Sequence, residues 1–247
     1  MPKVELHLHL DCSLSYEVVR KIKPEISPHD YQRDFIAGVK CTSLVDYLKC
    51  AVSGIELMQT PDQLRWVTLD LFNQLKNDGG IYAEIRFAPL QHLEKGLSAK
   101  EVVEIVNEAM IQSQMDTGIH SGLILCTLRH FSEEQSMQTI RLVEESLGTS
   151  VVGFDIAADE AGYPIDAHIR AFKYAKEKGI PCTAHAGEAC GPKSVWETLE
   201  NFFPRRVGHG VRSIEDAKLI AHLVEHKIHL EVCPTSNVQT NICADVC

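Results

Sequence analysis

Val4-Glu-Leu-His-Leu-His-Leu-Asp11, near the start of the chain, alternates apolar and polar residues in the way that predicts a β-strand. On a strand, residues two apart point to the same side, so the leucines would face one layer and His7 and His9 the other. Asp11 follows at the point where the strand would end. The segment therefore predicts a strand that carries two imidazoles to one side of a sheet.

Six further segments have β-strand character and are separated by stretches of helical periodicity. Together with residues 4–10, the predicted strands are residues 81–87, 122–128, 151–157, 182–186, 206–209 and 228–233. Regular alternation of strands and helices predicts a parallel sheet, which is either open and doubly wound or closed into a barrel.

The intervening helices have clear start and stop signals. Thr60 with Gln63, and Ser98 with Glu101, have the spacing of capping boxes, and Gly179 has the place of a helix-ending glycine. A further helix is expected to begin at Ser213. Apolar residues at helical spacing would line the buried faces: Leu64, Val67, Leu71 and Leu75; Val102, Ile105, Val106, Ala109 and Met110; Ile165, Ile169 and Phe172; Ile220, Leu223 and Val224.

Two features favour a closed (β/α)8 barrel of the TIM type. No Gly-x-Gly-x-x-Gly follows the first strand, and titratable residues recur at the carboxyl ends of strands, where barrel active sites lie.

About seventy residues separate the first two strands, so we expect a helical insertion there. The residues after Cys233 are too few for another helix and strand. We therefore expect residues 1–247 to form a single barrel domain that is incomplete at its C-terminus and lacks the eighth strand region.

Composition narrows the class of protein. The chain has 247 residues, 45% hydrophobic and 23% charged, which is typical of a globular domain, and a formal net charge of -10. This acidic balance disfavours nucleic acid and anionic membranes as partners. The sequence has no signal-peptide pattern and no apolar run of about 18 residues that would span a membrane. Nine cysteines without regular spacing then predict reduced thiols in a cytoplasmic protein.

Histidines at predicted strand ends are the first candidates for chemistry. His7 and His9 would be costly to bury unless a divalent metal or ordinary hydrogen bonds satisfied their nitrogens. His185, near the end of the strand predicted over residues 182–186, could point to the same end of the sheet. Three imidazoles and a water molecule would make a catalytic rather than a structural zinc site.

Other polar residues lie near the same predicted strand ends. Glu188 could act as general acid or base beside a metal, or it could cap the next helix. His209, between two glycines, has room to orient or deprotonate a water molecule, or it is an exposed turn histidine. The acidic residues in the segment 154–160 could contact a ligand or begin a helix.

Four segments, taken in order, resemble the motifs of adenosine deaminases. They are Val4-Glu-Leu-His-Leu-His-Leu-Asp11, Thr183-Ala-His-Ala-Gly-Glu188, Val207-Gly-His-Gly210 and Cys233-Pro-Thr-Ser-Asn237. The resemblance extends from the first predicted strand to the end of the chain. It implies a (β/α)8 barrel with one zinc ion per chain. It also implies a purine nucleoside substrate: adenosine, and with it 2′-deoxyadenosine, hydrolysed to inosine and ammonia in purine salvage.

The resemblance also implies a role for each matching residue. His7, His9 and His185 would bind the zinc ion. Glu188 would protonate ring nitrogen N1 of the purine. His209 would orient the attacking water and help to take its proton.

The substrate contacts implied by the resemblance include two departures from the family. Asp11 would hydrogen-bond the ribose 5′-hydroxyl, and the backbone N–H of residue 158 would meet N3 of the purine. The family usually has glycine where this chain has Cys12 and Ala158, so these side chains can crowd a substrate. The family's Ser-Leu-Asn-Thr-Asp-Asp-Pro-like strand, whose first Asp completes the zinc site, has no counterpart here. We therefore expect the chain as given to be weakly active or inactive.

Several alternatives remain. The nearest are an adenine or AMP deaminase and a binuclear amidohydrolase; the binuclear type usually has a bridging lysine on the fourth strand, and residues 151–157 contain none. The cytidine-deaminase signature, His-x-Glu with Pro-Cys-x-x-Cys, is absent. A non-catalytic protein that keeps a purine-nucleoside pocket would also fit the departures. The sequence makes no prediction of the oligomeric state.

Overall fold

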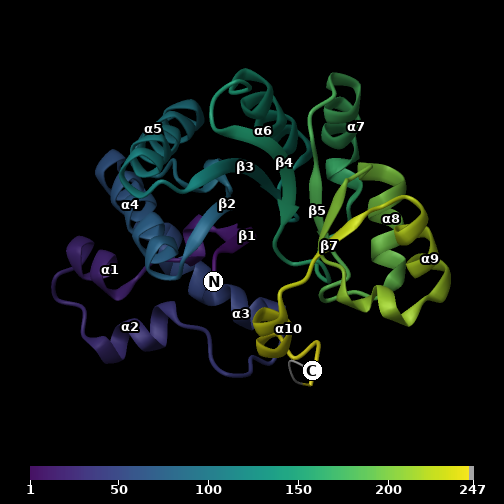
Figure 1. The fold of residues 1–247 in the computed structure, drawn as a ribbon, viewed down its shortest axis with the longest axis horizontal. Helices are drawn as coiled ribbons and strands as arrows, with labels where there is room; N and C mark the ends of the chain where they lie inside the picture. Colours follow the sequence, from purple (N-terminus) through teal and green to yellow (C-terminus); the bar gives the residue numbers. More distant parts are fainter. Residues whose placement is uncertain (245–247) are drawn as a thin grey trace. The chain divides into compact units, whose positions relative to one another are not determined.

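The computed structural model describes residues 1–244 (Figure 1). Each segment predicted as a strand is a strand, and four α-helices follow the first of them as the predicted insertion. The strands are β1 (Lys3–His9), β2 (Gly80–Phe87), β3 (His120–Leu128), β4 (Val151–Ala157), β5 (Thr183–Ala186), β6 (Arg206–His209) and β7 (His229–Glu231). The α-helices are α1 (Tyr16–Ile22), α2 (Pro28–Phe35), α3 (Leu44–Glu56), α4 (Pro61–Asn77), α5 (Ala99–Thr117), α6 (Glu133–Glu145), α7 (Ile169–Lys178), α8 (Pro192–Phe202), α9 (Ala217–Glu225) and α10 (Pro234–Gln239). Short 3-10 helices are η1 (Leu10–Cys12), η2 (Pro89–Gln91), η3 (Asp166–His168) and η4 (Val211–Glu215).

The strands form two sheets, in the orders β1-β2-β3-β4 and β5-β6-β7. The pairs β1–β2, β5–β6 and β6–β7 are parallel, as expected when helices connect successive strands. The α/β class is therefore confirmed. By their internal contacts, the described residues divide into two compact units: unit 1 comprises residues 1–38, 47–124 and 145–152, and unit 2 comprises residues 39–46, 125–144 and 153 onward.

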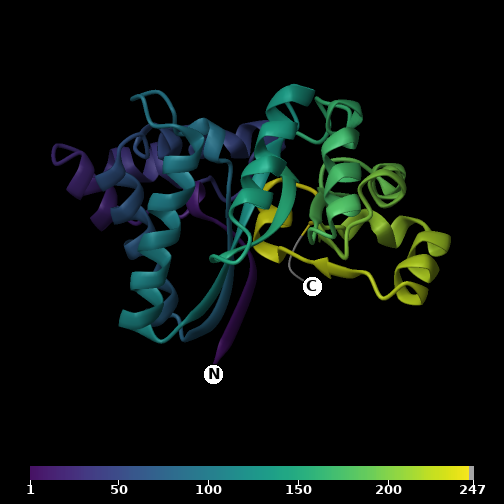
Figure 2. The same ribbon diagram turned by 90° about the horizontal axis from the view of Figure 1, so that it is seen from above.

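Unit 1 contains β1, β2 and the helices that follow β1. Helices α4 and α5 pack side by side (Figures 1 and 2). The predicted apolar stripe of α4 is buried. Ser98 and Glu101 form the predicted capping box at the start of α5. Helix α3 approaches the end of β1 closely at Gly54, where a Cβ atom would lie 2.3 Å from the backbone oxygen of Asp11. This close approach, which only glycine allows, contributes to the burial of Asp11.

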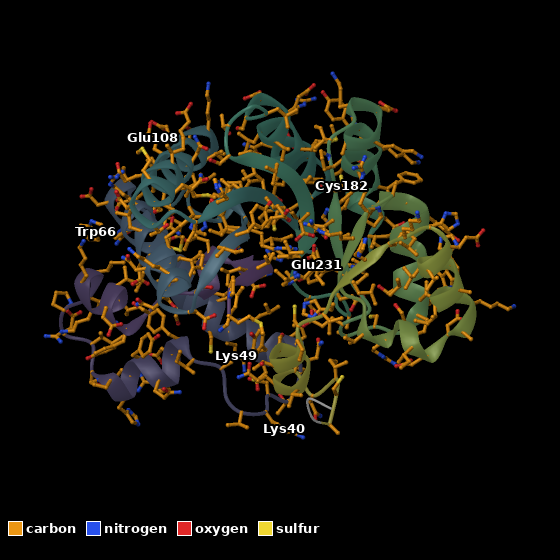
Figure 3. All side chains as sticks on the ribbon, in the orientation of Figure 1. Lys40, Lys49, Trp66, Glu108, Cys182 and Glu231 are labelled. Atoms are coloured by element: carbon orange, nitrogen blue, oxygen red, sulfur yellow. The ribbon has the colours of Figure 1, made fainter. Side chains whose placement is uncertain are left out.

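Unit 2 contains β5, β6 and β7 with helices α7, α8 and α9. Phe172 of α7 stacks on Phe202 of α8 with ring centroids 3.9 Å apart, and it also contacts Phe154 of β4. Glu231 of β7, labelled in Figure 3, accepts a 2.6 Å hydrogen bond from Nε of Arg206 on the neighbouring strand. The core beside these strands is aliphatic and comprises Ala186, Val195, Leu199, Val207, Leu219 and Leu223.

Two predicted boundaries were wrong. The helix expected at Ser213 begins at Ala217, because Asp216 caps it by accepting from the backbone N–H of Lys218, and Ser213 lies in η4. The last strand is shorter than residues 228–233. The strand ends at Glu231, and α10 begins three residues later at Pro234, because proline favours the first turn of a helix.

The predicted stripe of α9 was also partly wrong. Leu223 is buried, but Ile220 is 37% and Val224 73% exposed. Leu219 and Leu223, four residues apart, form the buried face instead.

Within residues 1–244, no helix combines the length and the apolar character needed to cross a membrane. The cysteines in this part of the chain form no disulfide bond.

Candidate active site

Strand β1 in unit 1 carries the two histidines of the first motif. The ring centroids of His7 and His9 are 5.3 Å apart, as expected for side chains two residues apart on one face of a strand. Both residues are half-buried. Unit 1 thus presents a pair of imidazoles near the carboxyl end of β1.

Asp11 follows these histidines in η1 and is 6% exposed. Burial raises its pKa to about 6; hydrogen bonds from the Cys12 thiol and from the backbone N–H groups of Asp11 and Ala88 oppose the rise. The Cys12 sulfur lies 3.6 Å from Oδ1 of Asp11. The carboxyl group implied to bind ribose therefore has a thiol at its side, where the family usually has a glycine.

In unit 2, His185 of β5 is held from two sides. Its Nδ1 atom lies 3.1 Å from Oδ2 of Asp155, a fully buried carboxylate on β4. Its backbone oxygen accepts a 3.0 Å hydrogen bond from Nη2 of Arg129. Because Asp155 engages Nδ1, Nε2 is the ring nitrogen with which His185 would bind a metal. Metal-binding histidines commonly have a carboxylate on the second nitrogen in this way.

Glu188 and His209 lie together in the same unit. Nε2 of His209 is 3.5 Å from Oε2 of Glu188, and its Nδ1 is 2.9 Å from Oδ1 of Asn237. His209 is 4% exposed, so it is not an exposed turn histidine. Glu188 does not cap α8 either. The N-cap residue of that helix is Gly191, and no side chain makes a capping hydrogen bond there.

Burial raises the pKa of Glu188 to about 7, from an ordinary value of 4.5. The charge of His185 lowers this pKa, and the charge of Glu160 raises it further. A carboxyl group with a pKa near 7 is partly protonated at neutral pH, so it can both donate and accept a proton. This behaviour suits a general acid.

Two residues at the strand ends of unit 2 have a strained backbone. Ala158, directly after β4, has a φ of 80°, and His209, at the end of β6, has a φ of 60°. Residues other than glycine rarely adopt this left-handed region, and such strain gathers at functional sites. The backbone turn at residue 158 therefore explains why a glycine suits this position.

Replacement of Ala158 by glycine is expected to stabilise the protein. The left-handed region costs alanine about 1–2 kcal/mol, whereas the added chain entropy of glycine costs about 0.5–1 kcal/mol. The net gain of up to about 1.5 kcal/mol should raise the melting temperature by up to about 3–6 °C in a thermal unfolding experiment. Ala157→Gly, one residue earlier within β4, is the matched control and should lower it. A lower melting temperature for Ala158→Gly would contradict the strain argument.

Sequence reasoning did not single out several residues that build this site. Asp155 and Glu160 lie in the acidic segment 154–160, which the sequence flagged without assigning a role to either residue. Asn237 is the last residue of the fourth motif, and its place in that motif is the sequence signal that could have identified it. Arg129 stands outside all four motifs, and no local pattern indicates its contact with His185.

The fold is a parallel α/β fold, and imidazoles and buried carboxylic acid side chains lie where its strands end. This combination is typical of one class of protein, hydrolases that use acid–base chemistry. A model of one family, described as adenosine deaminase, matches residues 2–246. The chain belongs to the adenosine deaminase family of metal-dependent hydrolases, which act in purine metabolism.

Individual relatives agree with this membership. An adenosine deaminase of Clostridium acetobutylicum is 38% identical over 247 residues, covering 97% of this chain and 74% of the relative. An adenine deaminase of Vibrio parahaemolyticus is 32% identical, covering 97% and 72%. Among solved structures, adenine deaminase from Arthrobacter aurescens has a TM-score of 0.87 at 25% identity, covering 98% of this chain and 75% of that one. Arabidopsis ADAL complexed with IMP has a TM-score of 0.85 at 26% identity, covering 99% and 74%.

Proposed function

We propose that this chain is a zinc-dependent deaminase that hydrolyses the 6-amino group of adenosine, and of 2′-deoxyadenosine, with release of ammonia. Family membership over nearly the whole chain supports the reaction class. The observation that carries the proposal is the buried Glu188 carboxyl group, with a pKa of about 7, lying 3.5 Å from the imidazole of His209. An acid and a base side by side are what addition of water to a purine ring requires.

The proposal includes a single domain of the (β/α)8-barrel type, of which residues 1–244 supply seven strands, and one zinc ion that His7, His9 and His185 would bind. The donor set fits zinc, because three imidazoles are a common ligand set of catalytic zinc. The contact between Asp155 and Nδ1 of His185 supports this assignment, since it orients the ring for binding through Nε2. A zinc ion held by these residues would act as a Lewis acid and would make water a nucleophile at neutral pH.

The residues of the chain then divide the proton transfers. Oδ1 of Asn237 accepts from Nδ1–H of His209, which leaves Nε2 of the neutral ring as a base for the attacking water. Protonated Glu188 donates to N1 of the purine while the water oxygen bonds to C6. The proton that His209 took from the water then passes to the exocyclic nitrogen, and the C6–N bond breaks with release of ammonia. The C6 carbonyl of inosine forms as the proton of the C6 hydroxyl returns to Glu188. Asp11 and the backbone N–H of Ala158 would hold the ribose and the purine.

Adenine is the competing substrate. The Vibrio relative and the Arthrobacter structure are both named adenine deaminases. In this chain Cys12 lies beside Asp11, at the proposed ribose position, and its side chain can narrow the space for a sugar. We favour adenosine because the adenosine deaminase of C. acetobutylicum shares more identical residues with this chain than the Vibrio protein does.

Ammonia release from adenosine, 2′-deoxyadenosine, adenine and AMP by the zinc-loaded chain tests this proposal. Because the sequence predicts weak turnover, the assay compares substrates with one another: we expect kcat/KM to be highest for the two nucleosides and expect inosine as the product from adenosine. A higher kcat/KM for adenine or AMP would overturn the substrate assignment. Binding of adenosine without release of ammonia would overturn the assignment as an enzyme and favour a nucleoside-binding protein. A sample stripped of metal is the control for zinc dependence.

A further inference from the structure

Glu160 of unit 2 is a buried carboxylate, 6% exposed, on the loop after β4. Its Oε1 atom accepts hydrogen bonds from the backbone N–H of Gly187 at 2.7 Å and from the hydroxyl of Ser194 at 2.6 Å. Its Oε2 atom accepts from the backbone N–H groups of Glu188 at 3.0 Å and of Cys190 at 2.9 Å. One side chain thus binds three amides of the turn that carries Glu188.

A carbonyl group of the same turn is bound as well, since Nη1 of Arg212 donates to the backbone oxygen of Ala189 at 3.1 Å. Just before the turn, Arg129 donates to the backbone oxygen of His185 on β5. The turn also packs tightly, because a Cβ atom on Gly187 would lie 2.6 Å from the side chain of Val195. Three amides and one carbonyl of the turn are therefore held by side chains from separate elements of unit 2.

Only a carboxylate suits the position of Glu160. An ionised carboxyl group is an acceptor at both oxygens, and four donors compensate the cost of burying its charge. A glutamine side chain in this place would put an NH2 group where one of the two carboxylate oxygens now lies, and this NH2 group would face backbone N–H groups. At least one of those N–H groups would then be buried without a partner, at a cost of the same order as a lost hydrogen bond.

We propose that Glu160 is a positioning residue of the active site, which fixes the turn 187–190 so that the carboxyl group of Glu188 lies beside His209. The inference rests on the proposed function, in which Glu188 donates a proton to the substrate. Glu160 does not touch the substrate; it acts through the three amides that it binds. Its effect should therefore appear in the catalytic step and in the order of the turn.

The test is the variant Glu160→Gln in the full zinc-loaded chain. A displacement of about 1 Å in a catalytic group can cost about 100-fold in rate, so we expect kcat for adenosine to fall by about 100-fold while KM changes by less than about threefold. In hydrogen–deuterium exchange, the peptide that covers residues 186–191 should exchange at least about tenfold faster than in the wild type, because its amides lose their acceptor.

Two further variants keep this test decisive. Glu197→Gln on α8 removes the same charge from a side chain that is 46% exposed and pairs with Lys193, so kcat and exchange should stay at wild-type values. Glu160→Asp keeps the charge but is one methylene shorter, and its kcat should lie between those of the wild type and Glu160→Gln. If Glu160→Gln does not fold, the aspartate variant decides: wild-type kcat and exchange in that variant would overturn the proposal.

The outcomes separate this inference from the proposed function. Wild-type kcat in a folded Glu160→Gln protein would overturn the positioning role, and so would unchanged exchange at residues 186–191. Absence of ammonia release from the wild type would instead contradict the proposed function. In that case the exchange rates of the turn still test whether Glu160 anchors it.

Discussion

Glu188→Gln is expected to lower kcat for adenosine by about 10³-fold in a protein that still folds and binds zinc. Glutamine has nearly the same shape as glutamate but no carboxyl proton, and loss of a general acid typically costs about 10²–10⁴-fold in rate. Burial and a pKa of about 7 make this residue able to donate a proton at neutral pH. The measurement is steady-state ammonia release at saturating adenosine, with Glu200→Gln, an exposed residue of α8, as the control. A decrease smaller than about tenfold would remove Glu188 from the proposed proton transfer.

Glu188→Gln is also expected to change how the stability of the metal-free protein depends on pH. Because the pKa of Glu188 is raised in the folded state, the folded chain binds more protons than the unfolded chain between about pH 4.5 and 7. The free energy of unfolding contributed by this group therefore falls as the pH rises through that window. Glutamine does not titrate, so Glu188→Gln should gain about 1–3 kcal/mol relative to the wild type between pH 4.5 and 8. A pH-independent difference in urea unfolding would contradict the raised pKa.

His185→Ala is expected to abolish stoichiometric zinc binding and, with it, deamination. The variant removes one of the three proposed imidazole ligands and leaves the buried carboxylate of Asp155 without its histidine partner. Zinc measured after dialysis should fall from about one ion per chain to less than about a tenth of that value. His120→Ala, which removes an exposed histidine at the start of β3, should keep both zinc and activity. Full zinc content in His185→Ala would overturn the proposed ligand set.

Asp155→Asn is expected to weaken zinc binding less than His185→Ala does. An amide can still contact Nδ1 of His185, but it has no negative charge to strengthen the imidazole as a ligand. Replacement of such orienting carboxylates typically weakens metal binding by about 10–100-fold. Competition with a zinc chelator would measure this change. Unchanged zinc affinity would show that Asp155 has only a structural role.

Local sequence patterns accounted for most of the fold. The bounds of the predicted and the observed strands agree within a few residues. The reason is that apolar alternation and helix-capping signals depend only on residues close to one another in the sequence. The boundary at Ser213 failed because Asp216, three residues later, is the true cap. The candidate residues Glu188 and His209 were found by their position at strand ends, and the structure brings these two together.

The sequence alone therefore determined the order of the strands and helices, the α/β class and the motifs that mark the family. It could not determine which partners surround each polar group. Asp155 meets His185 across 30 positions of the chain, and Glu160 meets the turn that bears Glu188 across 27 to 30 positions. Only the packing of β4 against β5 and of its loop against α8 makes these pairs. The raised pKa of Glu188 follows from the same packing, because desolvation depends on every atom that folding places around a carboxyl group and not on its neighbours in sequence.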